Sequence, residues 1–526
     1  MSEPEFDYIV VGAGSAGAAL TYRLSERSTY RVLLLEAGRE SHPWSPIPVG
    51  FAKLINNPAA NWCYRAEPEP RTGNRAIAVP RGRLLGGSSS INGMVFVRGQ
   101  AQDFDTWAQL GNRGWSYADV LPLFKRMESY PGGDTAYRGR AGPLHVSDLT
   151  ESGPLYDALF KAGEQIGLPR NKDYNGAEQE GLAMTQATIR NGRRMSTAHC
   201  YLKPASKRPN LTIETGALTE QLLFDGKRCV GVKYRVGNDV REAHACGEVI
   251  LSAGAVDSPQ LLELSGIGNP NLLRDAGITV RHPLPGVGEN LRDHYAPRLR
   301  WTLTKPVAYT RGANLIWQGL RYLVKRDGLL SLPASPIRGY FRSRDGLDSP
   351  DAGFAFFPFT SDANLRLEAD PGLTGVAYLL RPESTGSIHV RSADPSTPPA
   401  IRFNFLEAQL DKDILVAAVR EIRRLINAPA MDDLRGLEEA PGEAISTDDE
   451  ILEWILATGE TTYHPVGTCK MGQDDRAVVD EKLRVRGLEC LRVADASIMP
   501  TLTSGNTNAP SIMIGEKAGD LILSDA

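Results

Sequence analysis

His464 is a residue whose type and setting could support chemistry in this chain of 526 residues. It lies in TTYHPVGTCKMG, residues 461–472, directly before a proline. Three roles are open to it: a metal ligand, an acid–base catalyst, or a histidine packed in a core. An imidazole suits proton transfer because its ordinary pKa lies near physiological pH. The residues around His464 do not by themselves choose among the three roles.

Metal binding is the role that the rest of the sequence disfavours. None of the eight histidines shows H-x-x-H or H-E-x-x-H spacing, and none of the six cysteines forms a C-x-x-C pair. We therefore predict no metal site. The cysteine pattern is typical of reduced, mostly buried thiols, and the acidic start MSEPEFDYIVVG does not read as a secretory signal. These two features predict a cytoplasmic protein.

A second candidate site lies near the N-terminus, in FDYIVVGAGSAGAALTYRLSE. The pattern predicts a buried strand over residues 8–11, a glycine turn, and a helix that begins near Ser15. Gly12, Gly14 and Gly17 have G-x-G-x-x-G spacing. In such a motif the first glycine permits a tight turn, the second lets the backbone approach a pyrophosphate, and the third lets helix and strand pack closely. The motif predicts a phosphate-binding helix N-terminus.

The next apolar run, YRVLLLEAG, predicts a second strand that ends at Glu36. Its carboxylate follows the first glycine of the motif at about the spacing expected for an acceptor of ribose hydroxyl groups. A carboxylate at this position disfavours a 2′-phosphate. We therefore predict that the site binds an adenine dinucleotide, although the motif alone does not separate NAD from FAD.

Four further segments decide between the two dinucleotides. They are PRGRLLGGSSSINGMVFVRG (80–99), VILSAGAVDSPQLLELSGIG (249–268), LPGVGENLRDH (284–294) and LRVADASIMPTLTSGNTNAPSIMIGEKAGDLI (491–522). The first is a glycine- and serine-rich loop ahead of a predicted apolar strand or helix, and the second predicts a strand, a turn and a helix. Together with the N-terminal motif and YHPVGTCKMG, they resemble the glucose-methanol-choline (GMC) oxidoreductase family from about residue 6 to 524. The match is loose over 304–450.

The resemblance implies that the dinucleotide is FAD and that a defined set of residues holds it. That set is Gly12, Gly14, Ser15, Ala16, Gly17 and Glu36 for the ADP half, Thr219 beside adenine, Arg83, Gly87, Ser88, Asn92, Gly93 and Met94 near the flavin, and Asp495, Ala496, Asn506 and Thr507 near the C-terminus. Some family members bond the flavin covalently through a histidine just before the asparagine. Ile91 occupies that position here, so we expect FAD that is not covalently bound.

The same resemblance places His464 at the position of the family's catalytic base and Asn506 at the position that orients the substrate oxygen. Asn508 is the alternative for the second role. The implied reaction is oxidation of a primary alcohol, aliphatic or aryl, to the aldehyde, with hydride transfer to flavin N5 and oxygen or a quinone as the final acceptor. We lean towards a dehydrogenase. A hydroxynitrile lyase that keeps FAD without redox use is the alternative function.

These residues need a scaffold that brings distant segments together. The resemblance implies an α/β (α+β) fold with a Rossmann-like FAD-binding domain and a second, substrate-binding domain made of a six-stranded antiparallel sheet flanked by helices. The FAD-binding domain is assigned residues 1–155, 196–303 and 461–526. The substrate-binding domain is assigned residues 156–195 and 304–460. The sequence predicts a C-terminal helix with Pro510 in its first turn, and the resemblance implies that its positive end points at the flavin.

The region 304–460 holds the predicted sheet of the second domain. PIRGYFRS, DAGFAFFPFT and GVAYLLRP predict strands, whereas GANLIWQGLRYLVKRDG and KDILVAAVREIRRLINAP have helical spacing. Four phenylalanines could line an alcohol pocket: Phe354, Phe356, Phe357 and Phe359. We expect most of them to be sheet-core residues, with one or two facing the site.

The overall charge and hydropathy exclude two classes of partner. A formal net charge of −4 without a long basic run gives no surface suited to nucleic acid. No run of apolar residues is long enough to cross a bilayer, although peripheral membrane contact stays open. The predicted partners are a small-molecule alcohol and an electron acceptor, and the sequence predicts no particular oligomer.

Overall fold

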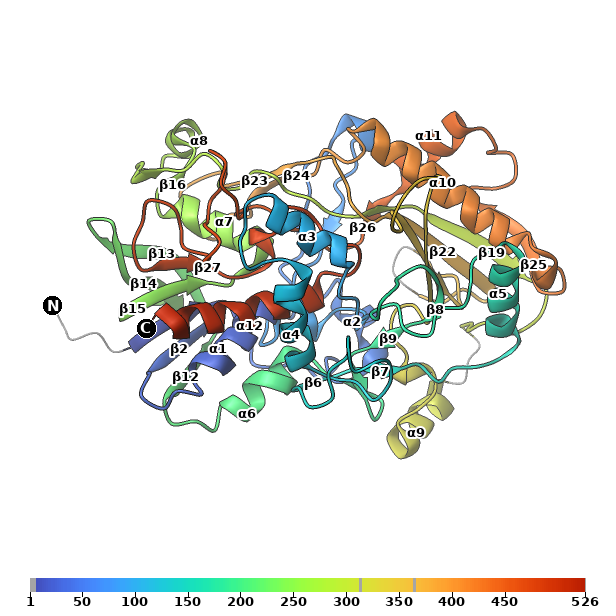
Figure 1. The fold of residues 1–526 in the computed structure, drawn as a ribbon, viewed down its shortest axis with the longest axis horizontal. Coiled ribbons are helices and arrows are strands. Elements are labelled where there is room, and N and C mark those ends of the chain that lie inside the picture. The colour runs from blue at the N-terminus through green and yellow to red at the C-terminus, as the bar shows by residue number, and fades with distance from the viewer. Residues whose placement is uncertain (1–5, 312–314, 363–365, 526) are drawn as a thin grey trace.

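The computed structural model describes residues 6–311, 315–362 and 366–525, which form two β-sheets with helices packed around them. Figure 1 shows the sheet that contains the N-terminal strands at the left and the second sheet at the right, beside helices α5 and α10. The mixed sheets and helices confirm the predicted α/β (α+β) class. Within the described ranges, no helix is both long and apolar enough to cross a membrane.

The first sheet has seven strands. Its order is β12 (Leu211–Thr215), β2 (Val32–Glu36), β1 (Phe6–Val11), β15 (Asp239–Leu251), β14 (Arg228–Val236) and β13 (Ala217–Asp225), with β27 (Leu491–Val493) also paired to β15. Strands β12, β2, β1, β15 and β27 are parallel, whereas β13, β14 and the first half of β15 form an antiparallel meander. Because the parallel strands all end at one edge, the loops that follow them meet there.

The N-terminal elements lie where the sequence predicts, although β1 begins at Phe6, two residues before the predicted strand. Strand β1 is followed by α1 (Ser15–Leu24), and β2 ends at Glu36. Gly12 has φ = 100°, and a Cβ atom there would lie 2.5 Å from the carbonyl oxygen of Ser252. The turn between β1 and α1 therefore requires glycine on two counts, its backbone conformation and its close approach to the end of β15.

The second sheet has the predicted six antiparallel strands. Its order is β25 (Arg435–Ala440), β19 (Arg298–Leu303), β22 (Gly372–Leu379), β21 (Ala352–Phe357), β20 (Ile337–Phe341) and β8 (Gly181–Met184). Helix α10 (Gln409–Ile426) packs on β21 and β22, and α5 (Pro154–Gln165) packs beside α10. The helices cover one face of this sheet and leave the other face towards the first sheet.

Side-chain alternation along β21 separates the phenylalanines. Phe354 and Phe356 are buried in the core shared with Ile422 of α10. Phe357 lies on the opposite face, and Phe359 follows just beyond the strand; both line the cavity described below. The structure thus confirms that only some of these rings face the site, as a two-residue strand repeat requires.

One predicted element differs in the structure. Residues 94–99, read as an apolar strand or helix, form neither, apart from a single bridge between Val95 and Ala187. The segment is buried, but its backbone groups bond to scattered partners: the Phe96 amide donates to the Gln186 carbonyl and the Arg98 amide to the Asn175 side chain. Because these partners satisfy its backbone, a buried segment here needs no regular element.

The remaining helices of six or more residues surround the two sheets. They are α3 (Ala101–Gln109), α4 (Tyr117–Met127), α7 (Gly254–Leu264), α8 (Pro270–Asp275), α9 (Leu315–Lys325), α11 (Asp448–Thr458) and α12 (Asn508–Asp525). The helix predicted in GANLIWQGLRYLVKRDG is α9, while residues 312–314 of that run lie outside the described residues. Helix α9 protrudes at the bottom of Figure 1 and exposes Leu320, Leu323 and Val324.

Candidate active site

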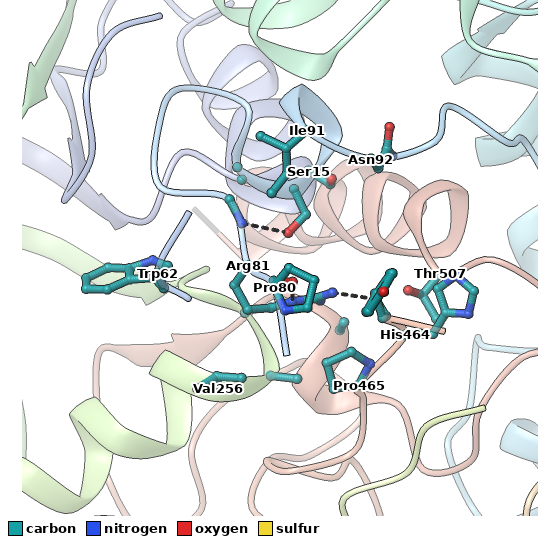
Figure 2. Close-up of a pocket in the computed structure, with 18 of the residues that line it drawn as sticks. Ser15, Trp62, Pro80, Arg81, Ile91, Asn92, Val256, His464, Pro465 and Thr507 are labelled. Carbon is teal, nitrogen blue, oxygen red and sulfur yellow. Dashed lines mark hydrogen bonds between the residues drawn. The ribbon is translucent and has the colours of Figure 1, made fainter. Parts of the chain in front are cut away.

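A cavity of about 680 Å³ lies between the edge where the parallel strands end and the uncovered face of the second sheet. It reaches from Glu36 at the end of β2 to Arg338 on β20. Figure 2 shows His464 and Thr507 at one side of it and Trp62 at the opposite side. Of the predicted site residues, all line this cavity except Gly17. The fold therefore gathers segments from both ends of the chain around one space.

The N-termini of three helices open onto the cavity. Helix α1 contributes Gly14 and Ser15, α7 contributes Gly254, and α12 contributes Asn508 and the residues before it. The first amides of a helix have no partner within the helix and carry partial positive charge. This side of the cavity is thus suited to an anionic pyrophosphate and to a ring that gains negative charge.

Gly14 and Gly87 bring two backbones together at the cavity wall. A Cβ atom on Gly87 would lie 2.8 Å from Cα of Gly14, whereas a Cβ atom on Gly14 would meet no protein atom closer than 4.0 Å. Protein packing therefore does not explain why residue 14 is a glycine. Close approach of a ligand to its backbone explains that glycine.

Gly17 lies behind the turn rather than in the cavity. A Cβ atom there would lie 2.0 Å from the carbonyl oxygen of Gly12. This is the role predicted for the third glycine of the motif, close packing of the helix on the strand. Gly17 shapes the site without facing it.

Glu36 stands at the far end of the cavity from His464 and is already held by backbone amides. Its side chain accepts from the amides of Ala13 at 3.0 Å and Gly38 at 2.8 Å. Burial raises the pKa of Glu36 to about 7, and the same two amides oppose the shift. The two hydrogen bonds fix the carboxylate at the end of β2, where an acceptor for ribose hydroxyl groups is predicted.

Trp62, Arg83 and Ile91 also line the cavity. The Arg83 guanidinium lies 4.4 Å from the centre of the Trp62 ring, and Trp62 stacks on Tyr64. Ile91 is buried and presents only carbon atoms of its side chain. Glycine loops, helix N-termini and a strand-end carboxylate thus fit the ADP half of FAD, and this apolar and aromatic wall fits its ring.

His464 and Asn506 meet at the other end of the cavity, although 42 residues separate them in sequence. The Asn506 side-chain nitrogen lies 2.9 Å from Nε2 of His464. His464 follows β26 (Glu460–Thr461), and Asn506 lies just before α12. The loop that holds His464 is fixed by Asp293, which accepts from the His464 amide at 2.9 Å.

His294 lies behind His464 and sets which of its nitrogens carries the proton. Nε2 of His294 donates to the Leu380 carbonyl at 2.9 Å, which leaves Nδ1 of His294 as an acceptor. Nδ1 of His464 lies 3.0 Å from that acceptor and 2.8 Å from the Thr462 hydroxyl. The hydrogen bonds therefore assign the proton of His464 to Nδ1 and a lone pair to Nε2.

Burial keeps both histidines neutral. Desolvation lowers the pKa of His294 to about 4. Desolvation also lowers the pKa of His464 well below its usual value, and the nearby His294, Arg81 and Arg338 act in the same direction. A neutral imidazole with an unprotonated Nε2 can accept a proton from a hydroxyl group placed in the cavity. In this structure Nε2 accepts a hydrogen bond from the Asn506 amide.

Arg338 fixes the orientation of the Asn506 amide. Its Nη1 lies 3.3 Å from Oδ1 of Asn506, so that the Asn506 nitrogen points to His464. Asn508, the alternative partner, accepts instead from the Ser15 hydroxyl at 2.7 Å, on the α1 side of the cavity. The geometry thus favours Asn506 over Asn508 as the donor beside His464.

Sequence reasoning missed three residues of this cluster. It assigned no catalytic role to Arg338, Thr462 or His294. Arg338 did carry a signal, because PIRGYF places a charged side chain inside an apolar strand. Thr462 and His294 carried none, because their roles depend on tertiary contacts. Among the described residues, no group of three metal-ligating side chains comes together.

Comparison with known proteins identifies the family of the chain. Residues 6–296 and 382–515 match the N- and C-terminal models of GMC oxidoreductases. The chain is 42% identical to an oxygen-dependent choline dehydrogenase of Photobacterium profundum, covering 98% of this chain and 93% of that protein. It is 44% identical to one of Sinorhizobium fredii, covering 98% and 95%.

Solved structures show that the fold of this chain is also similar to that of known oxidases. A pyridoxine 4-oxidase from Mesorbium loti superposes with a TM-score of 0.89 at 31% identity, covering 98% of this chain and 99% of that chain. A formate oxidase from Aspergillus oryzae, studied for its FAD modification, superposes with a TM-score of 0.91 at 27% identity, covering 99% and 98%. The chain belongs to the GMC oxidoreductase family.

Proposed function

We propose that this chain oxidises a primary alcohol, aliphatic or aryl, to the aldehyde, with His464 as the base and Asn506 as the group that orients the hydroxyl oxygen. As a GMC oxidoreductase it is an enzyme that acts on CH–OH groups and depends on FAD. The observation that supports the proposal most strongly is the unprotonated Nε2 of His464, which meets the Asn506 amide within the cavity.

Each residue has a separate task in this reaction. His464 accepts the hydroxyl proton at Nε2, while His294 and Thr462 hold Nδ1 in place. The Asn506 amide donates to the oxygen as negative charge develops on it and cannot compete for the proton. When bound, FAD supplies the two-electron acceptor that takes the hydride from the carbinol carbon at flavin N5.

The same residues suggest how the cofactor is held. We expect Gly12, Gly14 and Glu36 to hold the ADP half, and Arg83, Asn92 and Thr507 to lie near the flavin, since all of them line the cavity.

The cofactor is expected to leave the protein on denaturation. Ile91 stands where some family members carry the linking histidine, and its side chain offers no nucleophile. Precipitating the holoenzyme with acid should release all of the flavin into the supernatant, where its absorbance measures it. Flavin that stays with the precipitated protein after a denaturing wash would contradict non-covalent binding.

The pH profile should reflect the lowered pKa of His464. A base is active when unprotonated, so activity is lost as the pH falls through its pKa. Since burial lowers that pKa, the acid limb of kcat/KM should lie below the ordinary histidine value of about 6.5. Measuring kcat/KM for an alcohol that does not itself titrate tests this. A limb at or above that value would contradict the assignment.

The electron acceptor and the alcohol can be identified in one experiment. Choline and pyridoxine, which appear in the names of the relatives, are both primary alcohols, and this supports a primary alcohol here. Holoenzyme is mixed with a panel of aliphatic and aryl primary alcohols, and aldehyde is measured under air, then anaerobically with a quinone. We expect aldehyde from at least one alcohol. The absence of aldehyde from the whole panel under both conditions would contradict the proposal.

A further inference from the structure

Arg338 is a buried positive charge in the wall of the cavity. It lies on β20, its residue is 2% exposed, and it lines the cavity beside Asn506. Its contacts within the described parts of the chain are with uncharged groups, and none of them is a carboxylate. A buried guanidinium without an anion lowers stability unless something else compensates it.

The hydrogen bonds of Arg338 are mostly long. Only the bond from Nη1 to the Tyr340 hydroxyl is short, at 2.8 Å. The contacts with Thr185, Ser335 and Asn506 measure 3.3, 3.4 and 3.3 Å, beyond the usual range for this kind of bond. Its donors are therefore available for a better acceptor than the neutral oxygens around them.

Arg338 nevertheless stays charged. Burial alone would lower its pKa, but Tyr340, Tyr378 and Tyr174 outweigh that effect and hold the pKa above the ordinary value. The Tyr174 ring also faces the guanidinium, 5.8 Å from its carbon. The side chain is thus held as a cation by aromatic groups that do not neutralise it.

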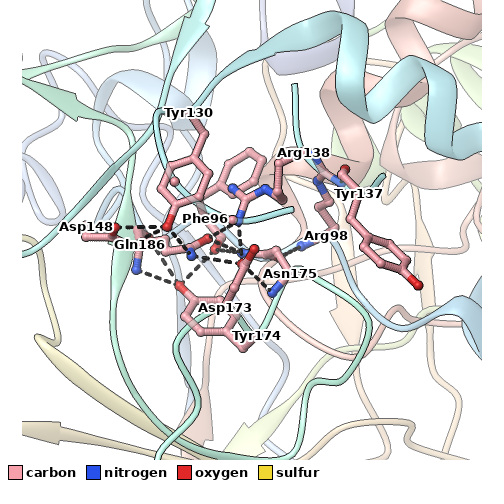
Figure 3. Close-up of polar contacts among 12 residues, drawn as sticks. Phe96, Arg98, Tyr130, Tyr137, Arg138, Asp148, Asp173, Tyr174, Asn175 and Gln186 are labelled. Atoms are coloured by element: carbon pink, nitrogen blue, oxygen red, sulfur yellow. Dashed lines mark hydrogen bonds and ion pairs between the residues drawn. The ribbon is translucent and has the colours of Figure 1, made fainter. Parts of the chain in front are cut away.

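Other buried arginines of this chain have partners that compensate for the burial of their charge. Arg98 and Arg138 both pair with Glu128, and Arg138 also pairs with Asp173, in the polar cluster of Figure 3. Arg194 has no carboxylate but donates four bonds to the carbonyl oxygens of other residues. Arg338 has no carboxylate partner and only one carbonyl oxygen, Oδ1 of Asn506 at 3.3 Å, and among these four arginines it is the one that faces the cavity.

The wall around Arg338 offers no acid to replace the missing partner. Within the described residues (6–311, 315–362 and 366–525), the second sheet contributes Arg298, Arg300 and Arg338 to the cavity wall and no carboxylate. Arg298 and Arg300 pair with glutamates, at 3.5 and 2.6 Å. The carboxylates that do line the cavity are Glu36, Asp257 and Asp495, which come from the first sheet and α7 side.

We propose that Arg338 binds an anionic group of the substrate, so that the preferred substrate is a hydroxy acid whose carboxylate lies close to its primary hydroxyl group. This inference rests on the proposed function, because it assumes that the hydroxyl group lies within hydrogen-bond reach of both His464 and Asn506. The 3.3 Å contact of Arg338 with Asn506 places the anion site next to the hydroxyl site. The same charge repels a quaternary ammonium group from this position.

The reaction balances with the groups already named. The hydroxyl proton moves to Nε2 of His464, and the carbinol hydride moves with its electron pair to the FAD cofactor. The C–O single bond becomes the carbonyl of an aldehyde acid, and the carboxylate stays ionised on Arg338. The proposed alcohol oxidation accounts for the proton and for both electrons, so the reaction needs no further reactant.

Binding tests the anion site without turnover. Holoenzyme is titrated with propanoate, which has the carboxylate but no hydroxyl group, and with propanamide, its neutral counterpart, while the flavin spectrum is followed. Propanoate should bind at least about tenfold more tightly, as a hydrogen bond to a charged group implies. Equal binding of the two probes would overturn the inference.

Variants assign the binding to Arg338. Arg338→Gln should weaken propanoate at least about tenfold and leave propanamide unchanged, whereas Arg338→Lys should retain part of the preference. Arg342→Gln is the matched control, because Arg342 follows β20, pairs with Glu180 and does not line the cavity. If Arg338→Gln retains its FAD and binds propanoate as tightly as the wild type, the inference is overturned. If that variant does not fold, Arg338→Lys and the comparison of propanoate with propanamide in the wild type decide whether the inference holds.

Turnover separates this inference from the proposed function. Three alcohols share a two-methylene chain: 3-hydroxypropanoate, its methyl ester, and choline. The expected order of kcat/KM is acid, then ester, then choline, with the preference of acid over ester lost in Arg338→Gln. If no alcohol of the earlier panel and none of these three reduces the flavin, but propanoate binds through Arg338, the proposed function fails and the anion site stands. If choline or the ester is preferred over the acid, the substrate class fails and the alcohol chemistry stands.

Discussion

His464→Ala is expected to slow anaerobic reduction of the bound flavin by an alcohol by about 100-fold or more, as loss of a general base does. The variant removes the one lone pair that the hydrogen bonds of His294 and Thr462 direct into the cavity. The Asn506 amide would remain, but it can only donate to the oxygen and cannot take the proton. The rate of flavin bleaching in a stopped-flow experiment measures the loss directly.

The controls for His464→Ala separate catalysis from folding. The variant should retain its FAD, because His464 lies at the opposite end of the cavity from Glu36 and the turn at Gly12. His244→Ala serves as a matched control, since His244 lies on the antiparallel part of β15, away from the cavity, and should reduce at the wild-type rate. Near-wild-type reduction in His464→Ala would show that this histidine is not the base.

Gly17→Ala is expected to abolish most of the FAD content. The added methyl group would lie 2.0 Å from the Gly12 carbonyl oxygen, and this neighbour is backbone that cannot turn aside. The turn that precedes α1 must therefore shift. Overpacking of this kind costs about 1–3 kcal/mol in stability. The ratio of flavin to protein absorbance in the purified variant, together with its melting temperature, measures both effects.

Gly319→Ala is the matched control for Gly17→Ala. Both glycines lie in helices, but a Cβ atom on Gly319 in α9 would meet no atom within 4 Å. Alanine has the higher helix propensity, by up to about 1 kcal/mol, so this variant should keep its FAD and be at least as stable as the wild type. A fully yellow Gly17→Ala protein would contradict the role assigned to the packing between α1 and the turn.

The cofactor half of the molecule could be predicted because its signals are local. Strand β1, the turn at Gly12 and the start of α1 at Ser15 follow from residues adjacent in sequence. Glu36 was predicted at the end of its strand for the same reason, and the structure places it there. Short-range rules for turns and strands suffice to predict a site whose residues all lie within a single βαβ-type unit.

The substrate half could be predicted only as far as its sheet. Alternating and aromatic runs predicted three strands of the sheet, and the family resemblance implied six, but neither showed which side chains face the cavity. Phe354 and Phe357 look alike in sequence and lie on opposite faces in the structure. His294 and Arg338 obtain their roles from neighbours 170 and 168 residues away. The assigned domain boundaries stay a prediction.

The most direct measurement of the central claim is anaerobic flavin reduction by a primary alcohol and by the same alcohol with deuterium on its carbinol carbon. Alcohol oxidation at the His464–Asn506 pair predicts complete bleaching of the flavin, slower with the deuterated alcohol because the carbon–hydrogen bond is broken in that step. A flavin spectrum unchanged by every alcohol, with cyanide released from a cyanohydrin, would contradict it.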